Sequence, residues 1–274
     1  MKKVTTVLAL LLIISLVFSC KKSSNAPPSN SNGNLFRIVD TLSGDTTNYY
    51  YNELQQVNAL QFISRGYSSY IDTFIYVHNN LKFSQYNLGT VLTTNPYART
   101  EYTYRGFLPV SSNYIFNNNV IAHCEFFFDN AGRLDSIDQT SYNPFAGIIG
   151  KTLAFKYDDD SNLTEIYQSY KENDTRQFLV ASLSNYDKHP NPVYKFPWTF
   201  DVDLYQYNYD KLSKNNCGKR RIYAPTADMV LVQGSSTYTY TYDTEGRVIT
   251  RATIDSPLHI PVSSFEVYYY GKTK

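Results

Sequence analysis

The chain has 274 residues, a formal net charge of +1 and 42% hydrophobic residues, among them 27 Tyr and 16 Phe but 1 Trp. This near-neutral chain shows none of the basic clustering that nucleic-acid binding requires, so nucleic acid is excluded as a partner. The many Tyr and Phe residues favour half-buried sheet surfaces and indicate an all-β fold.

Residues 1–19 have the pattern of an export signal. Lys2 and Lys3 precede an apolar run from Val7 to Phe18 that only Ser15 interrupts. The run is shorter than the roughly 20 residues of a membrane-spanning helix, and its length fits the hydrophobic region of a secretory signal peptide. The sequence therefore predicts that the rest of the chain acts outside the cytoplasm.

The stretch "LVFSC", residues 16–20, resembles the lipobox of bacterial lipoproteins, with the small residue Ser19 directly before Cys20. The resemblance implies cleavage before Cys20 and its acylation, and hence a lipid anchor in the outer membrane, on the periplasmic face or at the cell surface. The alternative is an ordinary signal peptide with an accidental cysteine. Residues 20–34 lack large apolar side chains beyond the cysteine, which predicts a disordered tether with a span of roughly 20 Å.

Residues 35–274 are expected to form one β domain, with the option of two halves joined near residues 171–215. Aromatic and β-branched runs between polar turns predict strands. These runs are Leu35–Leu42, Asp72–His78, Leu81–Tyr86, Thr100–Arg105, Tyr114–Phe116, Val120–Phe128, Thr152–Tyr157 and Phe265–Tyr270. A short helix is expected around Arg176–Ser184.

Four segments repeat an aromatic-x-aromatic pair followed by Asp or Asn. They are "YYYNELQQVNAL" (49–60), "FFFDNAGRLDSI" (126–137), "FKYDDDSNLTEI" (155–166) and "YTYDTEGRVITR" (240–251). The Asp or Asn side chain can accept hydrogen bonds from the next amides, and a glycine three positions later tolerates positive φ. The repeat predicts short hairpins with a bulge. A bulge, or a return strand buried on both faces, would explain why apolar residues such as Leu134 and Ile137 lie three apart.

This frame resembles the YD repeat of RHS-type proteins, in which serial hairpins build a continuous sheet. In addition, "NYDKHPNP" (185–192) followed by "LSKNN" (212–216) is similar to the central linker of Bacteroidota lipoproteins of unknown function that carry degenerate repeats of this kind. The resemblance covers about residues 45–270. It implies an antiparallel hairpin-repeat sheet, extended or curved, with little helix and no established activity.

The sequence offers weak signals for catalysis or metal binding. Asp158, Asp160 and Asn162 have the alternate spacing of a calcium loop, but Leu163 and Ser169 replace the glycine and glutamate that such a loop needs. The histidines share no zinc-type spacing. We therefore expect no metal, no cofactor and no enzyme, although the plentiful carboxylates keep open a hydrolase acting on polysaccharide or envelope polymer.

Cys124 and Cys217 either form a disulfide, which an extracytoplasmic site permits, or lie buried as separate small residues.

The stretch "HPNPVYKFPW", residues 189–198, carries three prolines and the single Trp. Tyr194, Phe196 and Trp198 either stack on a ligand, as aromatic side chains do at recognition sites, or cap the core where two halves meet. The resulting hypothesis is a membrane-anchored binding or scaffold module for a glycan or an envelope protein.

Overall fold

The computed structural model describes residues 34–65, 69–88, 98–143, 147–170, 174–194, 210–225, 230–257 and 262–271. These residues form antiparallel strands and one short 3-10 helix, η2 (Asp210–Leu212). The strands are β1 (Leu35–Asp40), β2 (Thr46–Tyr51), β3 (Val57–Ile63), β4 (Tyr70–Val77), β5 (Asn80–Leu88), β6 (Ala98–Arg105), β7 (Leu108–Phe116), β8 (Asn119–Phe128), β9 (Leu134–Asn143), β10 (Gly147–Tyr157), β11 (Leu163–Tyr170), β12 (Asp174–Ser184), β13 (Lys219–Pro225), β14 (Val230–Tyr242), β15 (Val248–Pro257) and β16 (Val262–Tyr270).

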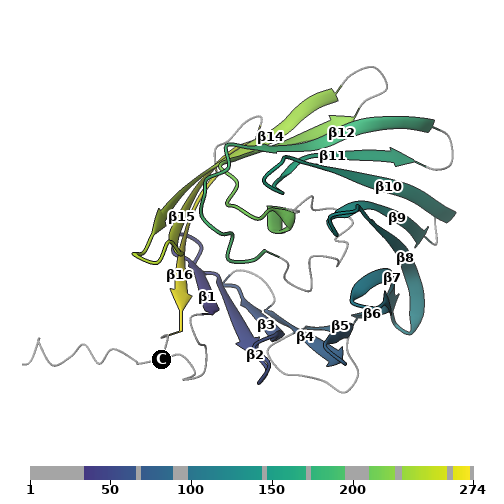
Figure 1. The fold of residues 1–274 in the computed structure, drawn as a ribbon, viewed down its shortest axis with the longest axis horizontal. Helices are drawn as coiled ribbons and strands as arrows, with labels where there is room; N and C mark the ends of the chain where they lie inside the picture. The colour runs from purple at the N-terminus through teal and green to yellow at the C-terminus, as the bar shows by residue number, and fades with distance from the viewer. Residues whose placement is uncertain are drawn as a thin grey trace, which may run out of the picture.

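The strands close into a barrel, so the expected extended or curved hairpin-repeat sheet is wrong. Each strand pairs with its neighbours in the sequence, and β1 pairs with β16, with Ile38 opposite Tyr268 and Asp40 opposite Glu266. Figure 1, viewed down the shortest axis of the molecule, shows the strands arranged in a ring. Closure satisfies the backbone groups that both edges of an open sheet would leave unpaired.

The strands expected from the sequence are confirmed, but the expected helix is wrong. Residues 176–184 belong to β12, which pairs with β11 and β13. A bulge in β12 buries both Val180 and Ala181, each fully covered. Two adjacent buried residues break the alternation of a regular strand, and this made the segment look helical.

Both ends of the described domain lie at one end of the barrel, which we call the terminal end. The amide of Gly271 donates to the carbonyl of Asn34 (3.0 Å). Because the strands run up and down in sequence order, the turns β2–β3, β4–β5, β6–β7, β8–β9, β10–β11 and β14–β15 and the long β12–β13 connection all open at this end. The turns β1–β2 and β7–β8 lie at the opposite end.

The core lies inside the barrel. On β14, Tyr238 belongs to the core cluster and Tyr240 and Tyr242 pack against it, whereas Thr239 and Thr241 between them are exposed. The same alternation places large apolar residues of most other strands inside, including the fully buried Tyr102, Phe155, Ile137, Leu153, Leu163 and Ile166.

The outer wall of β8 to β11 carries charged side chains beside exposed aromatic ones, Phe127 of β8 and Tyr142 of β9. Glu125 of β8 lies opposite Asp138 of β9, and Lys156 of β10 lies opposite Glu165 of β11. Asp138 also accepts a hydrogen bond from the Thr152 hydroxyl (2.7 Å). Among the described residues, no helix has the length and apolar character needed to cross a membrane.

Candidate functional site

The four repeated segments form the same turn at the terminal end, which confirms the predicted hairpins. In the β8–β9 turn, the Asp129 amide donates to the Arg133 carbonyl and the Gly132 amide donates back to the Asp129 carbonyl, both at 2.9 Å. The Asp129 carboxylate accepts from the amides of Ala131 and Arg133, also at 2.9 Å. The β2–β3, β10–β11 and β14–β15 turns repeat the backbone pattern, with a positive φ of 62° to 77° at Gln55, Gly132, Ser161 and Gly246.

A bulge follows each of these turns and accounts for the apolar spacing of three. In β8–β9, Phe128 pairs with Leu134 but Phe127 pairs with Ser136, so Asp135 is the extra residue. This extra residue turns both Leu134 and Ile137 inward, where they are 3% and 0% exposed. The predicted bulge is thereby confirmed.

Tyrosine hydroxyls tie successive hairpins together at the terminal end. Each donates to the carbonyl of the residue that opens the preceding return strand: Tyr51 to Leu35 (2.5 Å), Tyr76 to Val57 (2.7 Å), Tyr157 to Leu134 (2.9 Å), and Tyr186 to Leu163. Burial raises the pKa of Tyr51, Tyr76 and Tyr157, and that of Tyr104 to about 12 despite its hydrogen bond to the Leu81 backbone. The tyrosine that precedes the turn therefore links its hairpin to the preceding one by a hydrogen bond.

The β12–β13 connection is the same turn with a long insertion. The Asp187 amide donates to the Asn216 carbonyl (3.2 Å), as the Asp129 amide does to Arg133, and the Asp187 carboxylate accepts from the His189 amide (2.9 Å) two residues on. In the β8–β9 turn, the second amide that donates to the carboxylate belongs to Arg133, four residues after Asp129. Here the Asn216 amide takes that role and donates to the Asp187 carboxylate (3.3 Å). Residues 190–214 thus lie between the two sides of one repeated turn.

The Asp187 side chain holds the two ends of this insertion together. Besides the two backbone amides, its carboxylate accepts from the Asn216 side-chain amide (3.2 Å) and from the Tyr242 hydroxyl of β14. The ring of His189 stacks on Tyr242, with 3.8 Å between centroids. Burial and the Asp187 carboxylate raise the pKa of the Tyr242 phenol, which keeps it a donor.

The insertion is also fastened to the β10–β11 turn from inside the barrel. The Ser213 hydroxyl, fully buried, accepts from the Leu163 amide (3.0 Å), and the Asn162 side chain accepts from the Asn215 amide (2.9 Å). Val193 and Leu212 pack against the core cluster. Figure 1 shows the described parts of the insertion, drawn in green, inside the ring of strands. A ring of sixteen strands is too wide for wall side chains to fill, so the insertion supplies part of the core.

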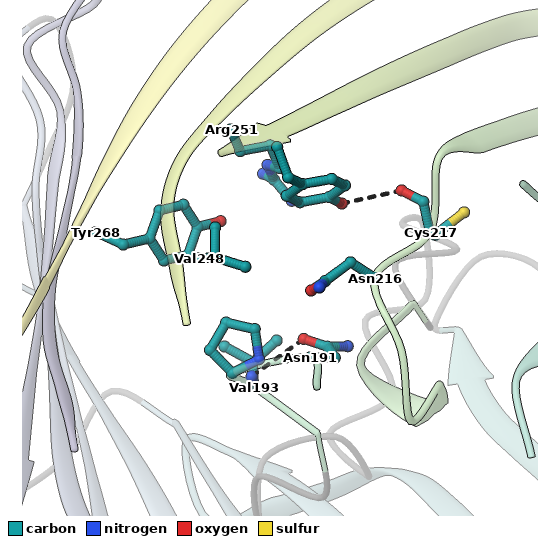
Figure 2. A pocket seen from close by; sticks show the side chains of 9 residues that line it. Asn191, Val193, Asn216, Cys217, Val248, Arg251 and Tyr268 are labelled. Carbon is teal, nitrogen blue, oxygen red and sulfur yellow. Dashed lines mark hydrogen bonds between the residues drawn. The ribbon is translucent and has the colours of Figure 1, made fainter. Parts of the chain in front are cut away.

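A small cavity lies between the insertion and the wall of β14 to β16. Its lining residues are Asn191, Pro192, Val193, Asn216, Cys217, Tyr240, Val248, Arg251 and Tyr268. Figure 2 shows Arg251, Val248 and Tyr268 on the wall facing Asn191 and Asn216 of the insertion. With a volume of about 30 Å³, the cavity holds a water molecule or two but no sugar ring.

The wall beside this cavity carries an ion pair. Arg251 Nη2 lies 2.6 Å from Glu266 Oε1, and the Tyr268 hydroxyl donates to the other carboxylate oxygen (2.8 Å). The Arg251 guanidinium also lies over the Tyr238 ring, 5.3 Å from its centroid. Burial raises the pKa of Tyr268, since the phenolate would be desolvated. Glu266 is thus held by two donors rather than presented to a substrate.

The structure places only one of the three predicted aromatic site residues. Tyr194 is half-buried, and its amide donates to the Asn191 carbonyl (3.1 Å) in a turn of the insertion. Phe196, Trp198 and the lipidation residue Cys20 lie outside the described residues.

Cys124 and Cys217 are both buried, and no disulfide joins them. Of the two readings of the sequence, the structure therefore has separate buried thiols and not the disulfide. The Cys217 thiol lies 3.1 Å from the Lys219 carbonyl, to which it donates.

The calcium-like segment 158–165 is occupied by its own turn. Asp158 accepts from the amide and the side chain of Asn162 (2.8 and 3.2 Å). Within the described residues, no group of three or more His, Cys, Asp or Glu side chains is arranged to hold a metal ion.

Sequence reasoning located the insertion as a linker but missed Asn216, Arg251 and Glu266. A signal for Asn216 was present, because Tyr186-Asp187 repeats the aromatic-Asp step of the other turns. The sequence signal for Arg251 is weak. Arg251 lies three residues after the start of its return strand, the position that Ile137 and Ile166 occupy in two other repeats. Glu266 has no local signal, because its partner is on another strand.

Comparison with known proteins identifies the fold. No known protein family and no curated protein matches the sequence. In a crystal structure, a porin-like protein from Bacteroides uniformis ATCC 8492 is similar over 89% of this chain and 99% of that chain, with a TM-score of 0.57 and 12% identity. A second porin-like protein, from Bacteroides vulgatus ATCC 8482, is similar over 87% of this chain and 99% of that chain, with a TM-score of 0.42 and 11% identity. At 12% identity, the likeness to the Bacteroides uniformis protein concerns the fold alone, which in this chain is a closed antiparallel β-barrel.

Proposed function

We propose that this chain is an outer-membrane lipoprotein, anchored through Cys20, whose barrel stands outside the bilayer as a binding or scaffold module. The charged side chains on the outer wall support this position. Lys156, Glu165, Glu125 and Asp138 point outward from four adjacent strands, and a basic side chain facing the middle of a bilayer costs about 2–4 kcal/mol. The common geometry of the four turns supports our further proposal that the chain belongs with Bacteroidota lipoproteins that carry YD-like repeats.

The observation that carries the binding role is the insertion of residues 190–214 into one turn of an otherwise regular scaffold. Variable loops on a rigid frame are the usual sites of recognition. The Asp187 and Ser213 contacts fix both roots of this loop, which lowers the ordering entropy that binding would otherwise cost. We assign the ligand to glycans or envelope proteins, with Tyr194, Phe196 and Trp198 as contacts and no catalytic role.

Binding by the full anchored chain tests this function. The chain is screened on envelope glycans and by cross-linking in cells, and each ligand is then tested against Tyr194→Ala, Phe196→Ala and Trp198→Ala. Phe127→Ala, on the outer wall and 46% exposed, is the matched control. We expect weaker binding in the insertion variants alone. Equal loss in the control, or turnover of a polysaccharide abolished by one carboxylate substitution, would refute the proposal.

Anchoring is tested separately by Cys20→Ala, which should release the protein from membranes. Unchanged membrane fractionation of this variant would contradict the lipid anchor without bearing on the ligand.

A further inference from the structure

Exposed apolar side chains form a row on the terminal end of the barrel. Leu54 (68% exposed) lies in the β2–β3 turn, Val77 (48%) leads into the β4–β5 turn, and Phe107 (84%) and Leu108 (44%) lie at the β6–β7 turn. We call these four residues the apolar rim. A phenylalanine so exposed at the tip of a turn leaves most of its ring in water, which costs free energy unless something covers it.

The three turns of the apolar rim are joined to one another. The Gln56 side chain donates to the Asn79 carbonyl (3.3 Å), and the Asn80 side chain donates to the Gly106 carbonyl (2.8 Å). Adjacent strands lie about 4.8 Å apart, so the four strand steps from the first turn to the third separate Leu54 from Phe107 by about 19 Å. The rim is therefore a line of separate tips along an edge, suited to a flat surface.

The described part of the chain begins beside the apolar rim. The Asn34 side chain, at the start of the described chain, donates to the Gln55 side chain (2.9 Å), and Gln55 is the neighbour of Leu54. A tether of residues 20–34 spans roughly 20 Å. A lipid on Cys20 would therefore hold the apolar rim within one tether length of the bilayer surface.

The charges around the apolar rim suit the same surface. Lys82 on β5 and Arg105 on β6 are exposed beside the tips, against one exposed carboxylate in these three turns, Glu53. The exposed carboxylates of the other terminal-end turns, Asp159, Asp160 and Glu245, lie away from the apolar rim, on β10–β11 and β14–β15. Basic side chains near a bilayer are attracted by anionic headgroups, and apolar side chains flanked by basic ones are typical of segments that lie in the interface.

We propose that the apolar rim rests in the headgroup region of the membrane to which the chain is anchored, with Phe107 and Leu54 inserted. The inference rests on the proposed anchor at Cys20. It sets the barrel with its terminal end down and its opposite end away from the bilayer.

Fluorescence quenching in vesicles tests this orientation. The acylated full chain is reconstituted in vesicles of phosphatidylethanolamine and phosphatidylglycerol with brominated acyl chains. Phe107→Trp is compared with Leu42→Trp, because Leu42 is also exposed (63%) but lies in the β1–β2 turn at the opposite end. After subtraction of the Trp198 signal, we expect quenching of the tryptophan at 107 alone. Equal quenching at both ends, or at neither, would overturn the proposal.

Partitioning of the Cys20→Ala chain to the same vesicles separates the apolar rim from the anchor. Leu54→Ser with Phe107→Ser should lower the partition coefficient roughly tenfold, a part of what full burial of both side chains would give, and Leu42→Ser should leave it unchanged. If the double substitution instead alters sedimentation without vesicles, the rim is a protein contact and the proposal fails. An acylated chain that does not pellet with vesicles would refute the anchor, while this partitioning still tests the rim.

Discussion

Removal of the Asp187 carboxylate should release the insertion from the barrel. In Asp187→Ala, the His189 amide loses its acceptor (2.9 Å), the Asn216 backbone and side-chain amides lose theirs (3.3 and 3.2 Å), and so does the Tyr242 hydroxyl. Asn216 is only 3% exposed, so water cannot readily take the place of the carboxylate.

The loss of stability follows from the number of hydrogen-bond donors that are left without an acceptor. A hydrogen bond to a charged group contributes about 1.5–3 kcal/mol, and a buried donor left without a partner costs about 1–3 kcal/mol. Allowing for the half-buried position of Asp187, we expect a loss of about 3 kcal/mol in the free energy of unfolding. For a chain of this size, that lowers the melting temperature by about 6–12 °C.

Asp129→Ala is the matched control for Asp187→Ala. Asp129 also accepts three short hydrogen bonds, from the Ala131 and Arg133 amides and the Arg133 guanidinium, but its side chain is 24% exposed and its donors belong to one short turn that water reaches. We expect a loss of about 1 kcal/mol. Thermal unfolding followed by far-ultraviolet circular dichroism measures both, and limited proteolysis should cut residues 190–214 faster in Asp187→Ala alone. Equal destabilisation and equal cleavage rates would show that Asp187 is an ordinary turn residue and would refute the reasoning.

Three further predictions concern the turns and their tyrosines. Ser161 has a φ of 66° where two other turns have glycine, so Ser161→Gly should raise the free energy of unfolding by about 0.5 kcal/mol in urea titrations, and a loss would contradict the strain argument. Burial raises the pKa of Tyr51 and Tyr76 above the ordinary value of 10, so their contribution to the free energy of unfolding is complete below pH 10 and is lost as the pH rises above it. Absorbance titration should show phenols that ionise only as the barrel unfolds, and free titration near pH 10 would refute this. The Arg247 amide, followed by its guanidinium, lowers the pKa of Asp243 below 3.8, so its contribution is present above pH 4 and is lost as the pH falls further; Asp243→Asn should flatten acid unfolding there, and an unchanged acid profile would count against it.

Local structure was predictable because its determinants are local. The Asp129 side chain and the positive φ at Gly132 act within five residues, and the bulge at Asp135 leaves its trace in the spacing of Leu134 and Ile137. The same logic failed at Val180 and Ala181, where a bulge in β12 copied a helical spacing. Periodicity alone does not distinguish a bulged strand from a short helix.

Closure of the barrel was not predictable from such patterns. An open sheet and a closed barrel have the same alternation on every inner strand, and they differ only in whether the first and last strands meet. Here Ile38 pairs with Tyr268, at the other end of the described chain. Likewise, the turn at Asp187 is completed by Asn216, 29 residues further on, so a search for short turns sees only its first half.

Closure and the insertion depend on one another. Sixteen strands closed into a ring leave an interior that wall side chains do not fill, and an unfilled apolar interior would cost stability in proportion to its volume. The segment that contributes Val193 and Leu212 to this interior enters through a turn whose two sides, far apart in the sequence, are joined by the Asp187 side chain. Its inner contacts, through Ser213 to Leu163 and through Asn215 to Asn162, are made with the neighbouring turn of the same repeat. The repeat therefore does more than build the wall, because its turn chemistry also provides the attachment points for the segment inside it.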